Sequence, residues 1–303
     1  MVVFTFPGFT KKSLTFSIDD GNLKTDRLWL DIMRPAGIKG TFNLCRDYTE
    51  EDRETLVSFY EGYEIANHVK HHPFAFDDKL TYTMMEGSGD GQEPDSTKIY
   101  PTETPGLCRF MTGRGWRMVA DTENYARFER ENREKLEAFF GEPIKGFVWP
   151  FCRQNNRELI AYLEARGYQS LRNSGVVGDS ENFDMPKDRM NWNMQACQNN
   201  LLAMLDAYEA LPDDGKLKFF CVGVHSIDYE VAGKWEDVKT FAQRVGHRTD
   251  LYRATVGEIF SYEDAVKSAE VTEHSIKNPS DLTLYAVVNG ENVTVEPGQT
   301  LTF

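Results

Sequence analysis

Two adjacent carboxylates and two histidines spaced four residues apart are the side chains of this sequence with the clearest chemical use. Asp19 and Asp20 end the alternating apolar run 13–18, and His68 and His72 follow a second apolar stretch. Two imidazoles and one carboxylate suit zinc or a related divalent ion and leave positions open for water and substrate. Because adjacent carboxylates repel each other, we expect one aspartate to bind the cation and the other to act as a base.

Each of these motifs also has an ordinary structural explanation. Asp19-Asp20-Gly21 alone fits a turn on the surface, and an isolated histidine pair is more often plain surface than a metal site. One helical turn after the preceding strand would point the imidazoles of His68 and His72 in the same direction. The choice between turn and metal site therefore depends on what the rest of the chain places beside them.

The elements that must position these residues follow a repeated strand–helix order. Leu14, Phe16 and Ile18 fall two apart, which is the period of a strand with one buried face. Predicted strands cover 1–8, 13–19, 38–44, 63–67, 144–149, 168–172, 218–224 and 251–254, and predicted helices cover 25–34, 49–61, 116–140, 156–166, 194–211, 235–245 and 256–269. This alternation predicts a parallel sheet, open or closed.

The candidate residues share one position relative to these strands. Each lies just past the carboxyl end of a predicted strand, and the set comprises Asp19, Asp20, His68, His72, Phe151 and His225. Barrels of alternating strands and helices place their active sites at that edge. The shared position favours the metal site over the surface turn.

Two segments depart from the alternation. From about 80 to 115, glycines and prolines replace the apolar periodicity, which predicts an insertion near the mouth of the site, with Tyr100, Arg109 and Arg114 as contacts, or else a solvated excursion. Residues 269–303 read as short strands around an Asn-Gly turn. We therefore expect a barrel domain over 1–268 and a small β-rich appendage over 269–303, which acts as a structural cap or as a small carbohydrate-binding unit.

Composition limits the functional classes. The 303 residues include 34 basic and 48 acidic side chains, and a net charge of -14 argues against a nucleic-acid partner. No run approaches the ~18 apolar residues that a membrane-spanning helix needs. The five cysteines are widely spaced and form no CxxC, so we expect free thiols in a reducing compartment. The start of the sequence lacks the pattern of a signal peptide, and we expect a cytoplasmic protein.

Four segments resemble the motifs of the polysaccharide deacetylases of the NodB-homology type, carbohydrate esterase family 4. Residues 17–21, Ser-Ile-Asp-Asp-Gly, resemble the first motif, usually Thr-Phe-Asp-Asp-Gly. The resemblance implies that Asp19 is the catalytic base and Asp20 a metal ligand. Residues 68–73 resemble the second motif, which implies that His68 and His72 complete the metal site and that His71 is a bystander.

The third and last motifs lie further along the chain. Residues 147–151, Phe-Val-Trp-Pro-Phe, resemble the third motif, which implies that the backbone N–H of Phe151 helps to form an oxyanion hole. Trp149 and Phe151 are then expected to stack on a sugar face or to belong to the core. Val224-His225 resembles the last motif and implies that His225 is the general acid. The match runs over about 2–260 and implies a distorted (β/α) barrel.

The sequence departs from the family pattern at two places. Val148 stands where many members carry an arginine that pairs with the catalytic aspartate, so we expect Arg172 or an arginine of the insertion to orient Asp19. In the family, an aspartate-tryptophan motif supplies the aspartate that orients the acid histidine. Asn191-Trp192 matches this motif only weakly. Asp184 and Asp188 lie nearby in the sequence.

The resemblance implies a metal-dependent hydrolase of C–N bonds other than peptide bonds, which removes an acetyl group from an N-acetylated poly- or oligosaccharide or a related amide. The expected cofactor is a divalent ion, zinc first, with cobalt, nickel, manganese or iron as alternatives. We expect no nucleic-acid or membrane partner, and the oligomeric state is left open. A non-catalytic carbohydrate-binding relative is one alternative. A non-haem iron oxygenase is another, because it shares the two-histidine, one-carboxylate site, although it would leave Asp19 and His225 without a task.

Overall fold

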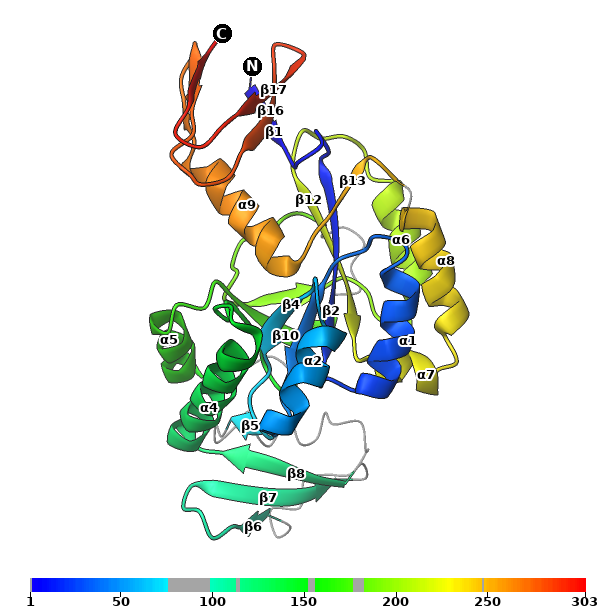
Figure 1. The fold of residues 1–303 in the computed structure, drawn as a ribbon, viewed down its shortest axis with the longest axis vertical. Helices are drawn as coiled ribbons and strands as arrows, with labels where there is room; N and C mark the ends of the chain where they lie inside the picture. The colour runs from blue at the N-terminus through cyan, green and yellow to red at the C-terminus, as the bar shows by residue number, and fades with distance from the viewer. Residues whose placement is uncertain (1, 76–98, 113–114, 152–155, 177–182, 247) are drawn as a thin grey trace.

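The computed structural model describes residues 2–75, 99–112, 115–151, 156–176, 183–246 and 248–303. A parallel sheet curls into a nearly closed barrel at its centre (Figure 1). Among the described residues this sheet has eight strands, in the order β11-β10-β9-β4-β3-β2-β12, with β13 beside β2. Their bounds are Lys12–Asp19 (β2), Thr41–Leu44 (β3), Glu64–Asn67 (β4), Gly146–Val148 (β9), Ser170–Val176 (β10), Trp192–Met194 (β11), Lys218–Val224 (β12) and Leu251–Arg253 (β13). The predicted distorted (β/α) barrel is confirmed.

Strand β2 is the centre of this sheet. Its alternate residues Leu14, Phe16 and Ile18 are fully buried, as their spacing predicts. One edge pairs with β12 along its whole length, and the other edge is divided between β13 near its start and β3 near its end. A Cβ atom at Gly223 of β12 would lie 2.3 Å from the backbone oxygen of Ser17, so only glycine permits this close strand approach. The aspartate pair therefore leaves the barrel from its most tightly held strand.

Helices pack around the barrel, and their ends carry the expected signals. They are Leu23–Met33 (α1), Arg53–Phe59 (α2, after the short 3-10 turn Glu50–Asp52), Thr122–Phe140 (α4), Arg157–Ala165 (α5), Leu201–Glu209 (α6), Ser226–Val231 (α7), Trp235–Gly246 (α8) and Val256–Ser268 (α9). Asp121 caps α4 by accepting a hydrogen bond from the Asn124 N–H, and Gly141 ends that helix in the left-handed conformation. Thr255 and Glu258 form a capping box on α9.

The predicted helix over 116–140 is wrong at its start. Residues Gly115–Ala120 form a strand, β8, and the helix begins only at Thr122. Strand β8 pairs with Leu107–Thr112 (β7), which pairs with Ile99–Pro101 (β6), while Phe74–Ala75 (β5) lies on the other side of β8. The described part of the predicted insertion is thus a small sheet at one end of the molecule (Figure 1). Residues 76–98 and 113–114, including Arg114, lie outside the described residues.

A second predicted helix, over 194–211, is also too long. Met194 belongs to the edge strand β11, and α6 begins only at Leu201. Between them, the Ala196–Val222 bridge and the hydrogen bond from the Gln195 N–H to the Cys221 carbonyl, 3.0 Å, bring the last strand back toward β12. The segment predicted as helix therefore supplies the near-closure of the barrel.

The tail forms two small sheets at the end of the molecule opposite to β6–β8 (Figure 1). One contains Val2–Thr5 (β1), Leu284–Val288 (β16) and Glu291–Val295 (β17), and the other contains Glu270–Val271 (β14), Ser275–Lys277 (β15) and Thr300–Thr302 (β18). The predicted Asn-Gly turn joins β16 to β17, with positive φ at both residues. The strand predicted at the start of the chain exists, but it pairs with β16 and not with the barrel. The domain division at 268 stays a prediction.

None of the helices in the described part of the chain has the length and apolar character that crossing a lipid bilayer would require.

Candidate active site

The carboxyl edge of the barrel carries the residues that the motifs identified. Asp19 ends β2 and Asp20 follows it, while His68 follows β4 and His225 follows β12. The nucleus of the site is a cavity of about 750 Å³, whose lining includes all four of these residues. This volume lies within the usual range for small-molecule sites.

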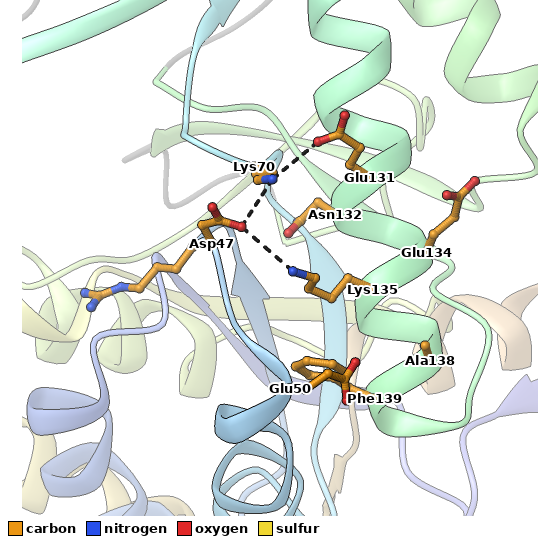
Figure 2. A pocket seen from close by; sticks show the side chains of 10 residues that line it. Asp47, Glu50, Lys70, Glu131, Asn132, Glu134, Lys135, Ala138 and Phe139 are labelled. Carbon is orange, nitrogen blue, oxygen red and sulfur yellow. Dashed lines mark hydrogen bonds and ion pairs between the residues drawn. The ribbon is translucent and has the colours of Figure 1, made fainter.

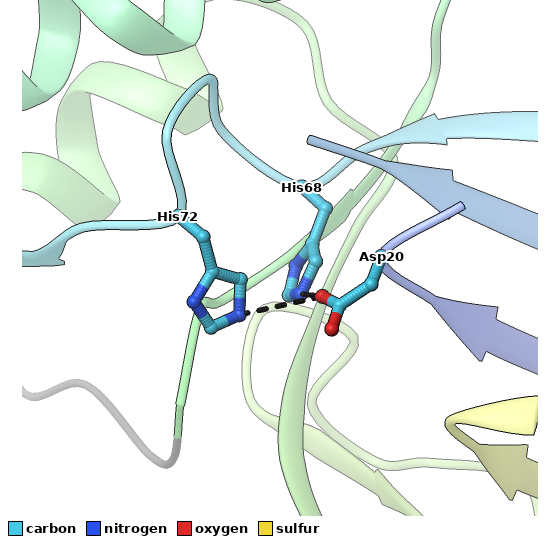
Figure 3. Close-up of side chains that lie close together, drawn as sticks. All are labelled: Asp20, His68 and His72. Carbon is cyan, nitrogen blue, oxygen red and sulfur yellow. Dashed lines mark ion pairs between the residues drawn. The ribbon is translucent and has the colours of Figure 1, made fainter. Parts of the chain in front are cut away.

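Three potential metal ligands converge in this cavity (Figure 3). Nε2 of His68 lies 3.5 Å and Nε2 of His72 3.6 Å from Oδ1 of Asp20. One ligand atom from each residue lies within 4.8 Å of the other two. The structure therefore brings together the three side chains that the resemblance implies, whereas the neighbouring His71 places its ring against Phe128, 5.1 Å between centroids.

The chemistry of this trio fits a divalent ion. Nδ1 of His68 is 2.9 Å from the backbone carbonyl of Val148 and donates to it, which leaves Nε2 with a lone pair. That Nε2 is buried and has no hydrogen-bond partner among the described residues. Burial lowers the pKa of His72 to about 3, so its imidazole is neutral and able to coordinate. A cation would give the orphaned nitrogen the partner that it lacks.

Asp20 is held in its charged form. Burial by itself raises the pKa of this carboxyl, but the neighbouring imidazoles of His68, His72 and His225 outweigh it and hold the pKa well below its ordinary value. A carboxylate that stays ionised over the whole working range of pH is a suitable ligand for a hard or borderline cation.

The loop between the two histidines is not the helical turn that the four-residue spacing suggested. Val69, His71 and His72 have positive φ values of 57°, 66° and 49°. A left-handed conformation is costly for residues with a Cβ atom, most of all for a β-branched valine, so the surrounding contacts must hold this loop in place. The imidazoles of His68 and His72 meet because of these backbone reversals and not because of helical periodicity.

One anchor of this loop is an ion-pair network around Lys70 (Figure 2). Its ammonium lies 3.2 Å from Asp47 and 3.3 Å from Glu131 of α4, and Lys135 of the same helix lies 3.8 Å from Asp47. The Lys70 side chain is largely shielded from solvent, at 20% exposure. The network thus ties the histidine loop to the outer helix, two residues from either candidate ligand.

Arg172 lies against Asp19. The guanidinium of this fully buried arginine donates to Oδ1 of Asp19, and the amide of Asn43 donates to the same oxygen at 2.7 Å. The sequence left Arg172 and an arginine of the insertion as possible sources of a cation that orients Asp19. The structure places Arg172 in contact with Asp19. Oδ2 of Asp19 is buried and has no hydrogen-bond partner among the described residues. One carboxylate oxygen is therefore fixed while the other remains available for a proton.

His225 has a carboxylate partner that sequence reasoning missed. Its Nδ1 lies 2.8 Å from Oδ2 of Asp228, and its Nε2 lies 3.7 Å from Asp20. Burial lowers the pKa of His225, but the hydrogen bond to Asp228 and the charge of Asp20 outweigh burial and raise the pKa to about 9. The available signal was local, because an acid three residues after His225 belongs to the first turn of α7.

Asp184 and Asp188, the aspartates near Asn191-Trp192 in the sequence, have partners other than His225. Asp184 pairs with Lys218 at 2.6 Å, and Asp188 accepts a hydrogen bond from the N–H of Met190. Trp192 packs between Phe219 and Phe260 in a second hydrophobic cluster. None of these contacts involves His225, which is held instead by Asp228.

The two aromatics of the third motif have different environments. Phe151 lines the cavity with positive φ, and its ring lies 4.4 Å from that of His72 and stacks on Phe74. Trp149 is 1% exposed and packs against Phe147 in the core. Of the two alternatives left open for Trp149, the core position is the correct one, and its buried ring cannot stack on a sugar.

A nearly closed parallel barrel with titratable groups at its carboxyl edge is the architecture of a (β/α)-barrel enzyme. The sequence profile of the polysaccharide deacetylase family matches residues 7–171, which is more than half of the chain. The chain therefore belongs to the polysaccharide deacetylase family and is a hydrolase of the deacetylase class. Among curated proteins, none matches the chain.

Solved structures share the architecture. A putative polysaccharide deacetylase from Mycobacterium smegmatis is 14% identical, with a TM-score of 0.55, over 89% of this chain and 96% of its own. The peptidoglycan deacetylase PdaC from Bacillus subtilis is 14% identical, with a TM-score of 0.46, over 85% of this chain and 94% of its own. A family 4 acetyl xylan esterase from Clostridium thermocellum, solved with a cobalt ion, is 13% identical, with a TM-score of 0.45, over 84% and 91%. The first of these shows a shared fold.

Proposed function

We propose that the protein is a metal-dependent hydrolase that removes the acetyl group from an N-acetylated sugar. The observation that carries this proposal is the convergence of Asp20, His68 and His72, with a buried imidazole nitrogen of His68 that lacks any partner among the described residues. Three protein ligands leave coordination positions free, as catalytic zinc sites require. Zinc is the first candidate for the ion, and cobalt, nickel, manganese and iron are alternatives.

The reaction adds water to the acetamide, forms a C–O bond to the acetyl carbon and breaks its C–N bond, which gives acetate and a free amine. When bound, the ion supplies a Lewis acid that polarises the carbonyl and acidifies water. Asp19 takes the proton of the attacking water on Oδ2, because Arg172 and Asn43 occupy Oδ1. The proposal thus gives the two neighbouring aspartates different tasks.

The remaining residues act on the other side of the scissile bond. His225 donates a proton from Nε2 to the departing amine, while Asp228 holds Nδ1 and stabilises the imidazolium. The backbone N–H of Phe151 is the proposed donor to the developing oxyanion, a type of contact whose loss costs about 100- to 1000-fold in rate. The left-handed backbone at Phe151 supports this role, because strained conformations of this kind gather at active sites.

The two alternatives differ from this proposal in measurable ways. A non-haem oxygenase shares the ligand set, but membership of a hydrolase family gives it no support. A non-catalytic carbohydrate-binding relative would bind acetylated ligands without releasing acetate. The buried Arg172–Asp19 pair argues for catalysis, because a pure binding protein has no need to bury a carboxylate and a guanidinium beside its ligand site.

The direct experiment is acetate release from chitooligosaccharides, peptidoglycan fragments and small N-acetyl sugars after chelation and after the addition of zinc or cobalt. We expect release only with metal, and an Asp19→Asn variant slower by about 100-fold or more. Equal release by wild type and Asp19→Asn would show that the base is assigned wrongly. Binding of these ligands with no acetate from any of them would favour the carbohydrate-binding relative.

A further inference from the structure

Three arginines line the cavity in a chain whose formal net charge is -14. Arg46 follows β3, Arg109 lies on β7 and Arg117 lies on β8. Within the described residues, none of the three guanidiniums forms an ion pair with a carboxylate. Six other described arginines do form such pairs, for example Arg244 and Arg248 with Glu209. Three guanidiniums that line one cavity without a carboxylate partner are available to an anionic ligand.

The acids of the cavity are already matched to other groups. Asp19 is paired with Arg172, Asp228 is paired with His225, and Asp20 faces the imidazoles of the candidate metal trio. These contacts leave the charges of the three lining arginines uncompensated. In a concave site, uncompensated cations attract an anion more strongly than the same cations on an open surface.

The side chain of Arg109 is held in place over an aromatic ring. Its guanidinium carbon lies 4.8 Å from the ring centre of Trp116, and the ring of Tyr100 meets Trp116 edge-on at 5.6 Å. Trp116 is 48% exposed, so this cation–π contact lies on the wall of the cavity and not in the core. Arg46 is fixed as well, because its Nε donates to the backbone carbonyl of Asp20 at 3.1 Å. Ordered guanidiniums lose less conformational entropy when they bind a ligand.

We propose that the substrate carries an anionic substituent, a carboxylate or a phosphate or sulfate ester, which Arg109 and Arg117 bind while the acetyl group lies at the aspartate–histidine centre. Planar guanidiniums match such oxyanions because they donate two parallel hydrogen bonds. Arg46 adds positive charge beside the strand end that carries Asp20. This inference rests on the proposed deacetylase function and narrows its substrate to acidic N-acetylated sugars.

Matched sugars test the substrate. N-acetylglucosamine, N-acetylmuramic acid and N-acetylglucosamine 6-phosphate share the acetamide and the ring and differ in charge. We expect the metal-loaded enzyme to prefer at least one acidic sugar over the neutral one by about tenfold or more in kcat/KM, because a charge-assisted hydrogen bond has about this value. Comparison of N-acetylmuramic acid, which carries a carboxylate, with N-acetylglucosamine 6-phosphate identifies which anion the arginines recognise. An equal kcat/KM for all three sugars overturns the inference and leaves the deacetylase function standing.

Arginine variants test the residues. Arg109→Gln combined with Arg117→Gln should bring the ratio of acidic to neutral kcat/KM close to one, mainly by raising KM for the acidic sugar. Arg27→Gln is the matched control, because Arg27 also lies over an aromatic ring, that of Phe59 at 4.4 Å, but is not among the residues that line the cavity. The control should keep the wild-type ratio. A double variant that keeps the preference overturns the assignment to these arginines.

A binding measurement separates the two hypotheses. In the Asp19→Asn enzyme, calorimetry with the three sugars reports affinity without turnover. Tighter binding of an acidic sugar that the Arg109/Arg117 variant abolishes supports the inference even if no acetate is released, in which case the proposed deacetylase function has failed alone. Equal affinity for acidic and neutral sugars overturns the inference whatever the activity.

Discussion

Arg172 is the register partner of Val148 on the neighbouring strand and extends its guanidinium to the carboxylate of Asp19. The resemblance expects an arginine at position 148, and here the cation comes from the adjacent strand at the same level of the sheet. The backbone carbonyl of Val148 serves another partner, since it accepts the hydrogen bond from Nδ1 of His68. With Arg172 in place of an arginine at position 148, Asp19 still has a cation beside it and Nδ1 of His68 still has a hydrogen-bond acceptor.

Replacing Arg172 by methionine should stop turnover and destabilise the fold. Removal of one partner leaves the buried Asp19 carboxylate unpaired, which typically costs about 3–5 kcal/mol. The combined variant Arg172→Met with Val148→Arg moves the cation back to the position of the family motif. We expect it to regain part of the acetate release that the single variant loses, measured beside urea unfolding of both. Recovery of stability without activity would contradict an orienting role.

Replacing Asp228 by asparagine should shift the alkaline side of the pH profile. Hydrogen bonding to Asp228 contributes to the raised pKa of His225, about 9, so the histidine remains an acid up to that pH and acetate release should fall as the pH rises through it. Loss of the carboxylate lowers the pKa of His225, and the fall should move to lower pH. The measurement is kcat against pH for both proteins. An unchanged alkaline limb would assign the proton donor to another group.

The candidate ligands can be separated from their histidine neighbour by metal content. His68→Ala and His72→Ala should each lose most of the bound metal, because one of three protein ligands is removed. His71→Ala is the matched control, since its ring packs on Phe128 and the metal trio excludes it. Elemental analysis after dialysis against zinc gives the result. Retention of full metal content by His68→Ala would require a different ligand set.

Lys70→Met tests whether the ion-pair network positions the histidine loop. We expect zinc affinity to fall by about tenfold, the lower end of the range for groups that support ligands without touching the metal. The pairs to Asp47 and Glu131 would be lost, and the left-handed residues Val69 and His71 would lose a restraint. Lys239→Met, which breaks an exposed pair with Glu236 on α8, is the control. Equal zinc affinity in both variants would show that the ion-pair network does not position the histidine loop.

Asp26→Asn should stabilise the protein near neutral pH. Burial raises the pKa of Asp26 to about 6, against the hydrogen bonds from Ser226 and Tyr60 that favour its charged form. Between the ordinary value of 3.8 and about 6, the folded state binds more protons than the unfolded state, so this group lowers stability as pH rises through that window.

The shift corresponds to about 2–3 kcal/mol at pH values above the window. Chemical unfolding of wild type and Asp26→Asn near pH 7 and about pH 4 measures the effect, and the variant's advantage should appear only at the higher pH. An advantage that is the same at both pH values would mean that packing and not ionisation is responsible.

The sequence predicted the barrel because its strands are apolar and end in polar residues, as β2 and β12 do. It predicted that Asp20, His68 and His72 come together because they belong to short motifs that follow strand ends. It named Arg172 as one of two possible sources of the cation beside Asp19 but could not choose between them, because the contact depends on the register between β9 and β10.

Local sequence signals gave a wrong prediction where one segment is compatible with both a strand and a helix. The segment 116–120 contains tryptophan and valine, which favour a strand, but a charged helical pattern begins directly after it, so the predicted helix was extended over these residues. The family motif pointed to residues before His225 for its acidic partner, whereas Asp228 follows it. The start of α7 at Ser226 is what brings an acid three residues later next to the imidazole.

The pairing of β1 with β16 has a practical consequence. Both ends of the chain lie in the tail sheets, at the end of the molecule opposite to β6–β8, whose residues Arg109 and Trp116 wall the cavity (Figure 1). A bead, resin or fused carrier attached through either terminus would therefore sit behind the barrel. The active-site cavity would then face away from the carrier, toward a polymeric substrate or surface in solution.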